Sequence, residues 1–262
     1  MSIAKQLWLT AASILLVATA AACSKDDEAT ATTSATTSRI VSTEKVYNEG
    51  NPYNSRSEYT YDAQGRIVAG LVVTAPGTEL ERSASYTLEY ADDLITYRTN
   101  GSTIKYHLEG GRIVSVDDNY YGHYTMVYDA EGHAVRECYE NGDTIFYEWA
   151  DGDLVRSYCH KNSAANEGIY DVTTHYTFTT IPTAAFPATD CGIGLKALAM
   201  QGFFGRQSLH LMESEQYVIA DNGDRVEGHS TYTYQLDSQQ RVTSANVETE
   251  SLPYTIRVAW SE

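Results

Sequence analysis

The sequence predicts an all-β protein, an antiparallel meander of about 14–16 strands that forms a large curled or barrel-like sheet with one short helical insertion. Three observations support this fold class. Apolar and polar residues alternate along short runs, turn-forming residues recur between these runs, and a pattern complete in YTYDAQGRIV at residues 59–68 returns in degenerate copies. Alternation with a period of two places successive side chains on opposite faces of a strand, and turns about every ten residues join antiparallel neighbours.

The turns of the repeated pattern have a direct chemical basis. The carboxylate of Asp62 can accept hydrogen bonds from backbone amides two residues further on, and Gly65 can adopt a positive φ without a Cβ clash. The Asn141-Gly142 pair suits a two-residue type I′ turn, whose twist matches that of the flanking strands. The residues predicted to build turns in these ways are Asp62, Gly65, Asp129, Gly132, Asn141, Gly142, Asp151 and Gly152.

Tyrosine dominates the apolar positions between the turns. The chain has 21 tyrosines, and tyrosine is a preferred strand residue. We therefore expect the alternating tyrosines to form mainly a core face. Tyrosines at one rim of the sheet would instead offer flat aromatic faces to a sugar or a peptide. The clearest alternating sets are Tyr59/Tyr61, Tyr86/Leu88/Tyr90, Ile104/Tyr106/Leu108, Tyr124/Met126/Tyr128, Ile145/Tyr147/Trp149 and Tyr232/Tyr234/Leu236.

The stretch at residues 183–207 breaks the strand rhythm. Leu195, Leu198 and Ala199 recur at helical spacing, while the glycines at 192, 194 and 202 keep any helix short. A closed sheet with well over about eight strands is too wide for its own side chains to fill. We therefore expect this apolar insertion to fold back across the concave face as a plug or a cap.

The first 22 residues predict a signal peptide that precedes a lipidated cysteine. Lys5 is followed by an apolar run at residues 7–18, and small residues then precede Cys23. This start resembles a bacterial lipoprotein signal, although Ala20 stands where such signals usually carry leucine. An ordinary secretory cleavage that leaves Cys23 unmodified is the alternative.

Residues 23–38 are predicted to form a tether. Ser24, Lys25, Asp26, Asp27 and Glu28 make a short acidic run that resembles the surface-export signal of some Gram-negative lipoproteins. A solvated charge cluster is the alternative interpretation. The Thr/Ala/Ser-rich residues 29–38 lack the apolar side chains needed for a core. Residues 39–262 remain for the β-meander domain, and we expect it to sit outside the outer membrane on a lipid anchor.

Charge and motif content limit the classes of partner and chemistry. The net charge of −17 argues against binding to nucleic acid or to an anionic membrane surface. The turn aspartates fall one per hairpin, unlike those of a calcium loop, and we expect no metal, no cofactor and no catalytic residues. Cys138 and Cys159 fall on strands separated by a third, beyond disulfide reach, which leaves the state of Cys191 open.

Two resemblances add to this interpretation. The Tyr61-Asp62-x-x-Gly65-Arg66 turn is similar to the YD repeat of Rhs-type shell proteins, whose copies build successive hairpins of a continuous sheet. The lipoprotein start, the YD-like hairpins and the segment GFFGRQSLHLMES at 202–214 together resemble a bacterial lipoprotein family of unknown function with a porin-like fold. That family implies a large curled β-sheet and supplies no catalytic residues.

The sequence favours a non-enzymatic binding or scaffolding role at the cell surface, for an extracellular ligand such as a glycan or a peptide. A hydrolase acting on an extracellular glycan or peptide is the alternative, and two carboxylates converging in one pocket would favour it. An outer-membrane channel is disfavoured, because the face opposite the tyrosines carries Thr, Glu, Arg and Ser rather than an apolar band.

Overall fold

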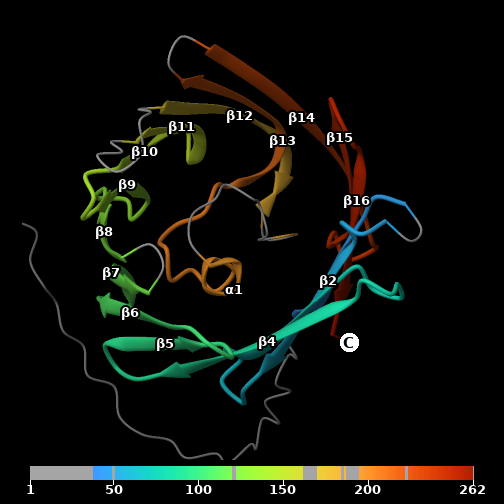
Figure 1. Ribbon diagram of the computed structural model, residues 1–262, viewed down its shortest axis with the longest axis horizontal. Coiled ribbons are helices and arrows are strands. Elements are labelled where there is room, and N and C mark those ends of the chain that lie inside the picture. The colour runs from blue at the N-terminus through green and yellow to red at the C-terminus, as the bar shows by residue number, and fades with distance from the viewer. Residues whose placement is uncertain are drawn as a thin grey trace, which may run out of the picture. The chain divides into compact units, whose positions relative to one another are not determined.

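The computed structural model describes residues 38–48, 51–119, 122–161, 170–183, 186, 195–221 and 224–261. Sixteen strands follow one another in chain order around a closed barrel, and β1 pairs with β16 to complete the ring (Figure 1). This confirms the predicted antiparallel meander. The strands are β1 (Ile40–Val46), β2 (Ser55–Tyr61), β3 (Ile67–Thr74), β4 (Arg82–Tyr90), β5 (Leu94–Arg98), β6 (Thr103–Glu109), β7 (Arg112–Asp118), β8 (Gly122–Tyr128), β9 (Ala134–Tyr139), β10 (Thr144–Ala150), β11 (Asp153–Lys161), β12 (Tyr170–Pro182), β13 (His210–Asp221), β14 (Asp224–Leu236), β15 (Val242–Thr249) and β16 (Tyr254–Trp260).

The predicted N-terminal features lie outside the described residues. They are the signal peptide at 1–22, the lipidated Cys23, the run of Ser24, Lys25, Asp26, Asp27 and Glu28, and all but the last residue of the tether at 23–38. All of them stay predictions.

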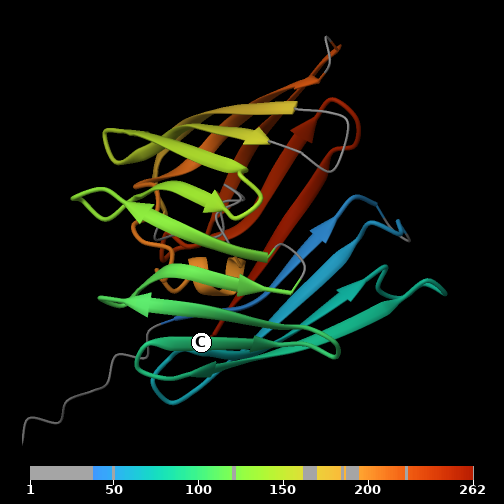
Figure 2. The same ribbon diagram turned by 60° about the vertical axis from the view of Figure 1, so that its left-hand side comes forward.

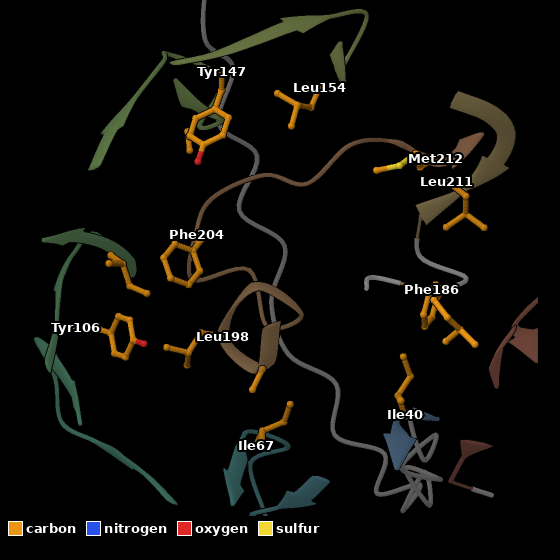
Figure 3. Packing of buried hydrophobic residues seen from close by; sticks show 14 of the residues in the cluster. Ile40, Ile67, Tyr106, Tyr147, Leu154, Phe186, Leu198, Phe204, Leu211 and Met212 are labelled. Carbon is orange, nitrogen blue, oxygen red and sulfur yellow. The ribbon is translucent and has the colours of Figure 1, made fainter. Parts of the chain in front are cut away.

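The aromatic face of the sheet points into the barrel. Its side chains pack with aliphatic residues from neighbouring strands into one cluster, part of which is drawn in Figure 3. The predicted core role is confirmed for the buried tyrosines, which are Tyr86, Tyr106, Tyr124, Tyr147, Tyr176 and Tyr232.

The outer face of the wall carries charged side chains. Arg156 on β11 pairs with Glu148 on β10, with Nη1 2.9 Å from Oε1. Asp117 on β7 bridges His107 and His123 on the two flanking strands, at 2.8 Å to each ring nitrogen. Exposed ion pairs of this kind contribute little to stability. Both groups of contacts place charged side chains in solvent on the outer face, one on β10 and β11 and the other on β6 to β8.

The turns that carry the repeated pattern gather at one end of the barrel. Consecutive antiparallel strands reverse direction, so every second connection lies at the same end. The turns β2–β3, β4–β5, β6–β7, β8–β9, β10–β11 and β14–β15 therefore share an end with the long insertion between β12 and β13. We call it the plugged end, and we call the opposite end the mouth.

A buried aliphatic residue restarts the chain after most of these turns. Each one lies beside a register shift in the strand ladder, and each exposes at most 1% of its surface. We call them the restart residues. They are Ile67, Ile113, Ala134, Leu154 and Val242.

An aromatic side chain at the end of the next strand closes over Ile40 and, among the described residues, over every restart residue except Leu154. In one copy, the Tyr90 hydroxyl donates a 2.6 Å hydrogen bond to the carbonyl of Ile67, and the guanidinium of Arg66 lies 4.5 Å from the centre of the Tyr90 ring. We call these two contacts together the clasp. The described residues contain five: Arg39 and Ile40 with Tyr61, Arg66 and Ile67 with Tyr90, Arg112 and Ile113 with Tyr128, His133 and Ala134 with Trp149, and Arg241 and Val242 with Trp260.

The turn aspartate orients the basic half of the clasp. Asp237 accepts hydrogen bonds from the backbone amide of Arg241 at 2.9 Å and from its Nε at 2.7 Å. The amide hydrogen bond is the largest cause that lowers the pKa of Asp237, and the guanidinium lowers it further. Asp62 makes the same contacts with Arg66, at 2.8 Å each. The Asp-x-x-Gly-Arg pattern therefore both builds a turn and positions a cation over the neighbouring ring.

The two ends of the barrel chain rebuild one of these turns without a covalent link. The Ser261 amide donates to the Arg39 carbonyl at 2.7 Å, and the Arg39 amide donates to Ser261 Oγ at 2.9 Å. Asp62 and Arg66 exchange the equivalent two hydrogen bonds within the continuous turn. Ser261 thus takes the place of the turn aspartate, and Arg39 takes the place of the restart arginine.

The predicted type I′ geometry is wrong at Asn141-Gly142. Gly142 has φ of +91°, whereas Asn141 is not among the residues with positive φ. Asn141 Oδ1 instead accepts a 2.9 Å hydrogen bond from the Asp143 amide, which favours a longer turn. Positive φ at both central positions occurs at Asp151-Gly152, with +53° and +84°. At the turn glycines Gly65 and Gly132, φ is +83° and +95°.

The described part of the insertion, residues 183, 186 and 195–207, lies inside the barrel, as the sequence predicts. Its helix α1 (Lys196–Ala199) is four residues long and sits within the ring of strands (Figures 1 and 2). Leu198 and Phe204 are buried against the barrel core, and Phe186 is buried with them. Among the described residues, no helix is long and apolar enough to cross a membrane.

Residues 201–209, which we call the plug segment, follow the inner perimeter of the plugged end. Their hydrogen bonds reach successive turns around the ring, so backbone groups that the bulged turns leave outside the ladder gain partners. In chain order the contacts are Gln201 with Ile67, Phe203 with Ile113, Arg206 with Gly132, Ser208 with Leu154, and Leu209 with Gly152.

A pair of glycines in the plug segment tests whether this segment is held against the turns. Gly205 and Gly202 have φ of +86° and +79°, so alanine at either position meets the left-handed penalty of about 1–2 kcal/mol. A Cβ at Gly205 would also lie 2.5 Å from the Gly132 carbonyl oxygen, whereas one at Gly202 would meet nothing within 4 Å. In chemical denaturation, Gly205→Ala should lose about 1–3 kcal/mol more than Gly202→Ala. Equal losses would contradict the close approach.

Candidate functional site

Two cavities that share a tyrosine lie toward the mouth. The inner pocket has a volume of about 410 Å³ and is lined by the inward faces of β10 to β13. The rim pocket has a volume of about 440 Å³ and is lined by the β1–β2 and β15–β16 connections, by Tyr217 on β13 and by residues 228–230 on β14. Both volumes fall in the range of about 300–1,000 Å³ that is typical of small-ligand sites. Tyr217 lines both cavities.

Strand register brings the inner-pocket side chains together. Tyr147 on β10 pairs with Ser157 on β11, Ser157 pairs with Thr174 on β12, and Thr174 pairs with Tyr217 on β13. Directly paired residues of an antiparallel sheet share a face, so this row crosses the lumen side of four strands. Glu215 lies two residues before Tyr217 on the same face and also lines the pocket.

A glycine determines where the Tyr217 ring lies. Gly228 on β14 is the direct cross-strand partner of Tyr217. A Cβ at Gly228 would lie 2.1 Å from Cζ of that ring, so the ring occupies the space of the missing side chain. The absence of a side chain at residue 228 thus lets Tyr217 lie flat against the wall between the two pockets.

The inner pocket is polar through hydroxyl groups and one carboxylate. The hydroxyls of Ser157 and Tyr176 are 3.0 Å apart, and the Tyr232 hydroxyl donates to Glu215 Oε1 at 3.0 Å. Among the described residues that line the pocket, Glu215 is the only formally charged side chain. The site therefore presents a negative charge in an aromatic and aliphatic surround.

A second carboxylate is buried in the adjoining core. Glu137 on β9 exposes 3% of its surface and accepts 2.8 Å hydrogen bonds from the hydroxyls of Tyr139 and Tyr147. Burial raises the pKa of Glu137, and the hydrogen bonds from Tyr147 and Tyr139 lower it only in part. Glu137 is absent from the lining of the inner pocket, so its role is in the polar packing behind Tyr147.

One ammonium group of the protein itself already lies beside the rim pocket. Nζ of Lys45 lies 3.9 Å from the ring centre of Tyr254 and 5.2 Å from that of Tyr47, and both tyrosines line the rim pocket. The two rings are 5.2 Å apart. An ammonium ion over aromatic faces is a cation–π arrangement.

The residues predicted from the sequence do not form this site. The predicted turn residues Asp62, Gly65, Asp129, Gly132, Asp151 and Gly152 lie at the plugged end, and Asn141 and Gly142 lie at a mouth turn. No disulfide joins Cys138 to Cys159, and Cys159 lines the inner pocket; Cys191 falls outside the described residues. Glu215, Tyr217 and Gly228 belong to ordinary alternating strand positions, so no motif marks them in the sequence.

One acidic cluster in the described residues has the composition of a metal site. Ligand atoms of Asp129, Glu131 and His133 lie within 4.8 Å of one another. Asp129 Oδ1 already accepts hydrogen bonds from the amides of Gly132 and His133, and Oδ2 lies 3.1 Å from the His133 ring nitrogen. His133 is also part of a clasp, stacked on Trp149 with ring centres 4.4 Å apart. Turn and clasp formation account for the cluster.

Comparison with solved structures shows a porin-like fold. A porin-like protein from Bacteroides uniformis aligns with a TM-score of 0.61 and 17% identity, over 85% of this chain and 98% of that chain. A porin-like protein from Bacteroides vulgatus aligns with a TM-score of 0.58 and 12% identity, over the same shares. At these identities the likeness concerns the fold alone. No protein-family model matches the sequence, and no curated protein matches it.

Glu137 should give the protein a specific dependence of stability on pH. Because its folded pKa is raised above the ordinary value of 4.5, the folded state binds the proton more tightly than the unfolded state does. The free energy of unfolding should therefore fall as pH rises from about 4.5 through the raised pKa. Glu137→Gln should flatten that fall in denaturation curves recorded at several pH values.

Glu148 supplies the matched control for this prediction, because it lies on the next strand and pairs with Arg156 on the exposed outer face. Glu148→Gln should retain the wild-type profile. A Glu137→Gln profile as steep as that of the wild type would assign the pH dependence to another group.

Proposed function

We propose that this protein is a non-enzymatic binding protein of the bacterial cell surface, held to the outer membrane by a lipid on Cys23, and that it takes an extracellular peptide or glycan into the mouth of its barrel. The observation that carries the proposal is the pair of tyrosine-lined cavities at the mouth, which share Tyr217. Tyrosine offers a large apolar face and a polar tip, and it therefore suits mixed ligands of this kind.

The point where the predicted tether joins the barrel supports ligand entry through the mouth. Arg39, the first residue after the predicted tether, lies at the plugged end, where it bonds to Ser261. The predicted tether would therefore join the barrel at the end opposite the mouth. The ligand site is then accessible to extracellular molecules.

The lipid anchor and the acidic run have their own test, which is surface proteolysis of intact cells. Cys23→Ala should release the protein from the membrane. Replacement of residues 25–28 by alanine should keep the protein anchored but protect it from added protease. Unchanged cleavage after that replacement would contradict the export role of the run.

Two observations weigh against transport through the barrel. Leu198 and Phe204 of the insertion are buried in the barrel core, and the wall carries exposed ion pairs such as Arg156 with Glu148. A membrane-embedded barrel needs a continuous apolar band of about 25 Å on its outer face. The charged wall instead fits a barrel that stands in water.

The inner pocket also favours binding over hydrolysis. Glycosidases commonly use a pair of carboxylates flanking the scissile bond. Of the described residues that line the inner pocket, Glu215 alone carries a carboxylate, and Glu137 is buried and bonded to two tyrosines. This arrangement lacks the facing pair of carboxylates that most glycosidases use.

A ligand-array screen tests the proposal. Residues 39–262 contain all sixteen strands and can be applied to glycan and peptide arrays as wild type, Tyr217→Ala and Tyr158→Ala. Tyr158 is a control because it lies on the outer face of β11, 6.3 Å from Phe146. We expect binding to one ligand class, its loss in Tyr217→Ala and its retention in Tyr158→Ala. No binding to either array, or turnover of a bound ligand, would overturn the proposal.

A further inference from the structure

We propose that the inner pocket selects a protonated primary amine carried on an apolar stem, the chemistry shared by a lysine side chain and a free polyamine. The inference rests on the proposed binding function and names the ligand class of the same site. It starts from the composition of the cavity. Glu215 is its only formally charged lining residue among those described, and it lies with Ile145, Val172 and Ile219 and with three tyrosines.

The charge in the pocket discriminates among ligand classes. A carboxylate in a partly dehydrated cavity attracts a cation more strongly than it would in water, and it repels an anion. A protonated amine can donate a charge-assisted hydrogen bond to Glu215, and such bonds are stronger than hydrogen bonds between neutral groups. The inner pocket presents neither arginine nor asparagine among its described lining residues, so a neutral sugar would have the Glu215 carboxylate as its only planar polar partner there.

The apolar lining suits the stem of the amine. Ile145, Val172 and Ile219 extend the cavity wall on β10, β12 and β13. A chain of methylene groups leaving water for such a wall contributes about 0.8 kcal/mol for each group fully buried. A bare ammonium ion lacks this contribution, which is why the proposal requires a stem.

Tyrosines at the same end of the barrel already contact an ammonium group of the protein itself. Lys45 places Nζ over Tyr254 at 3.9 Å and near Tyr47 at 5.2 Å. Tyr217 separates this occupied rim from the inner pocket. The rim therefore has its own cation, and the inner pocket has a carboxylate with tyrosine rings and no cation among its described lining residues.

Gly228 makes the pocket sensitive to a single methyl group. Alanine there would put Cβ 2.1 Å from the Tyr217 ring and force it out of its position between the cavities. Gly70 provides a matched control, because a Cβ there would lie 2.3 Å from the ring of its own cross-strand partner, Tyr86. That pair lies on β3 and β4, away from the strands of the inner pocket.

Calorimetric titration of the full-length protein, purified in nonionic detergent, tests the proposal with two matched pairs of probes. N-acetyl-Gly-Lys-Gly-amide is compared with its norleucine analogue, and pentylammonium is compared with pentanol. We expect at least tenfold tighter binding of the charged member in one or both pairs. Preference only in the peptide pair identifies a lysine side chain as the ligand, and preference only in the small-molecule pair identifies a free amine.

Variants connect the preference to the pocket. Glu215→Gln should abolish it, whereas Glu213→Gln, at an exposed carboxylate two residues earlier on β13, should preserve it. Gly228→Ala should weaken binding at least tenfold, and Gly70→Ala should leave binding unchanged in protein that remains folded by thermal melting. Equal binding of charged and neutral probes, or an unaffected Glu215→Gln, would overturn the amine proposal. An array ligand that depends on Tyr217 but not on Glu215 would leave the binding function standing and sink the amine inference alone.

Discussion

The clasp is the contact on which the architecture of this barrel depends. A bulged turn leaves the carbonyl of a buried restart residue such as Ile113 beside a break in the ladder, and an unpaired buried carbonyl costs about 1–3 kcal/mol. The Tyr128 hydroxyl supplies the missing donor at 2.6 Å. Burial raises the pKa of Tyr128 to about 12, although Arg112 lowers it in part, so the hydroxyl keeps its proton. Four clasps follow turns of the plugged end in this way, and the fifth follows the junction of Ser261 with Arg39 that completes the ring.

This arrangement divides the barrel into a structural end and a variable end. The restart residues and the plug segment line the plugged end, where Phe203 bonds to Ile113 on β7 and Arg206 bonds to Gly132 in the turn between β8 and β9. The mouth has no such inner lining in the described residues, so its cavities remain between the walls. Tyr217 can lie flat there because Gly228 has no side chain. A rigid closed end and an open tyrosine-lined end together suit a binding protein.

The fold was predictable because its signals are local, and the site was not because its signals are long-range. Alternation identifies the strands, and Asp62 with Gly65 identifies a turn within five residues. The clasp partner of Ile67 is Tyr90, which lies 23 residues later in the chain, at the end of the next strand. No local pattern therefore reveals it. The inner pocket requires the register of four strands, and Glu215 alternates like any strand residue. Asn141 misled for a local reason, since its side chain bonds to the Asp143 amide.

Removal of one clasp hydroxyl is the most direct measurement of the central claim. Tyr128→Phe deletes the donor to the Ile113 carbonyl and keeps the ring under Arg112, while Tyr53→Phe deletes a hydroxyl from a side chain that is 69% exposed. Chemical denaturation should show a loss of about 1–3 kcal/mol for Tyr128→Phe and almost none for Tyr53→Phe. Equal stabilities of the two variants would contradict the view that the clasp holds the strands together.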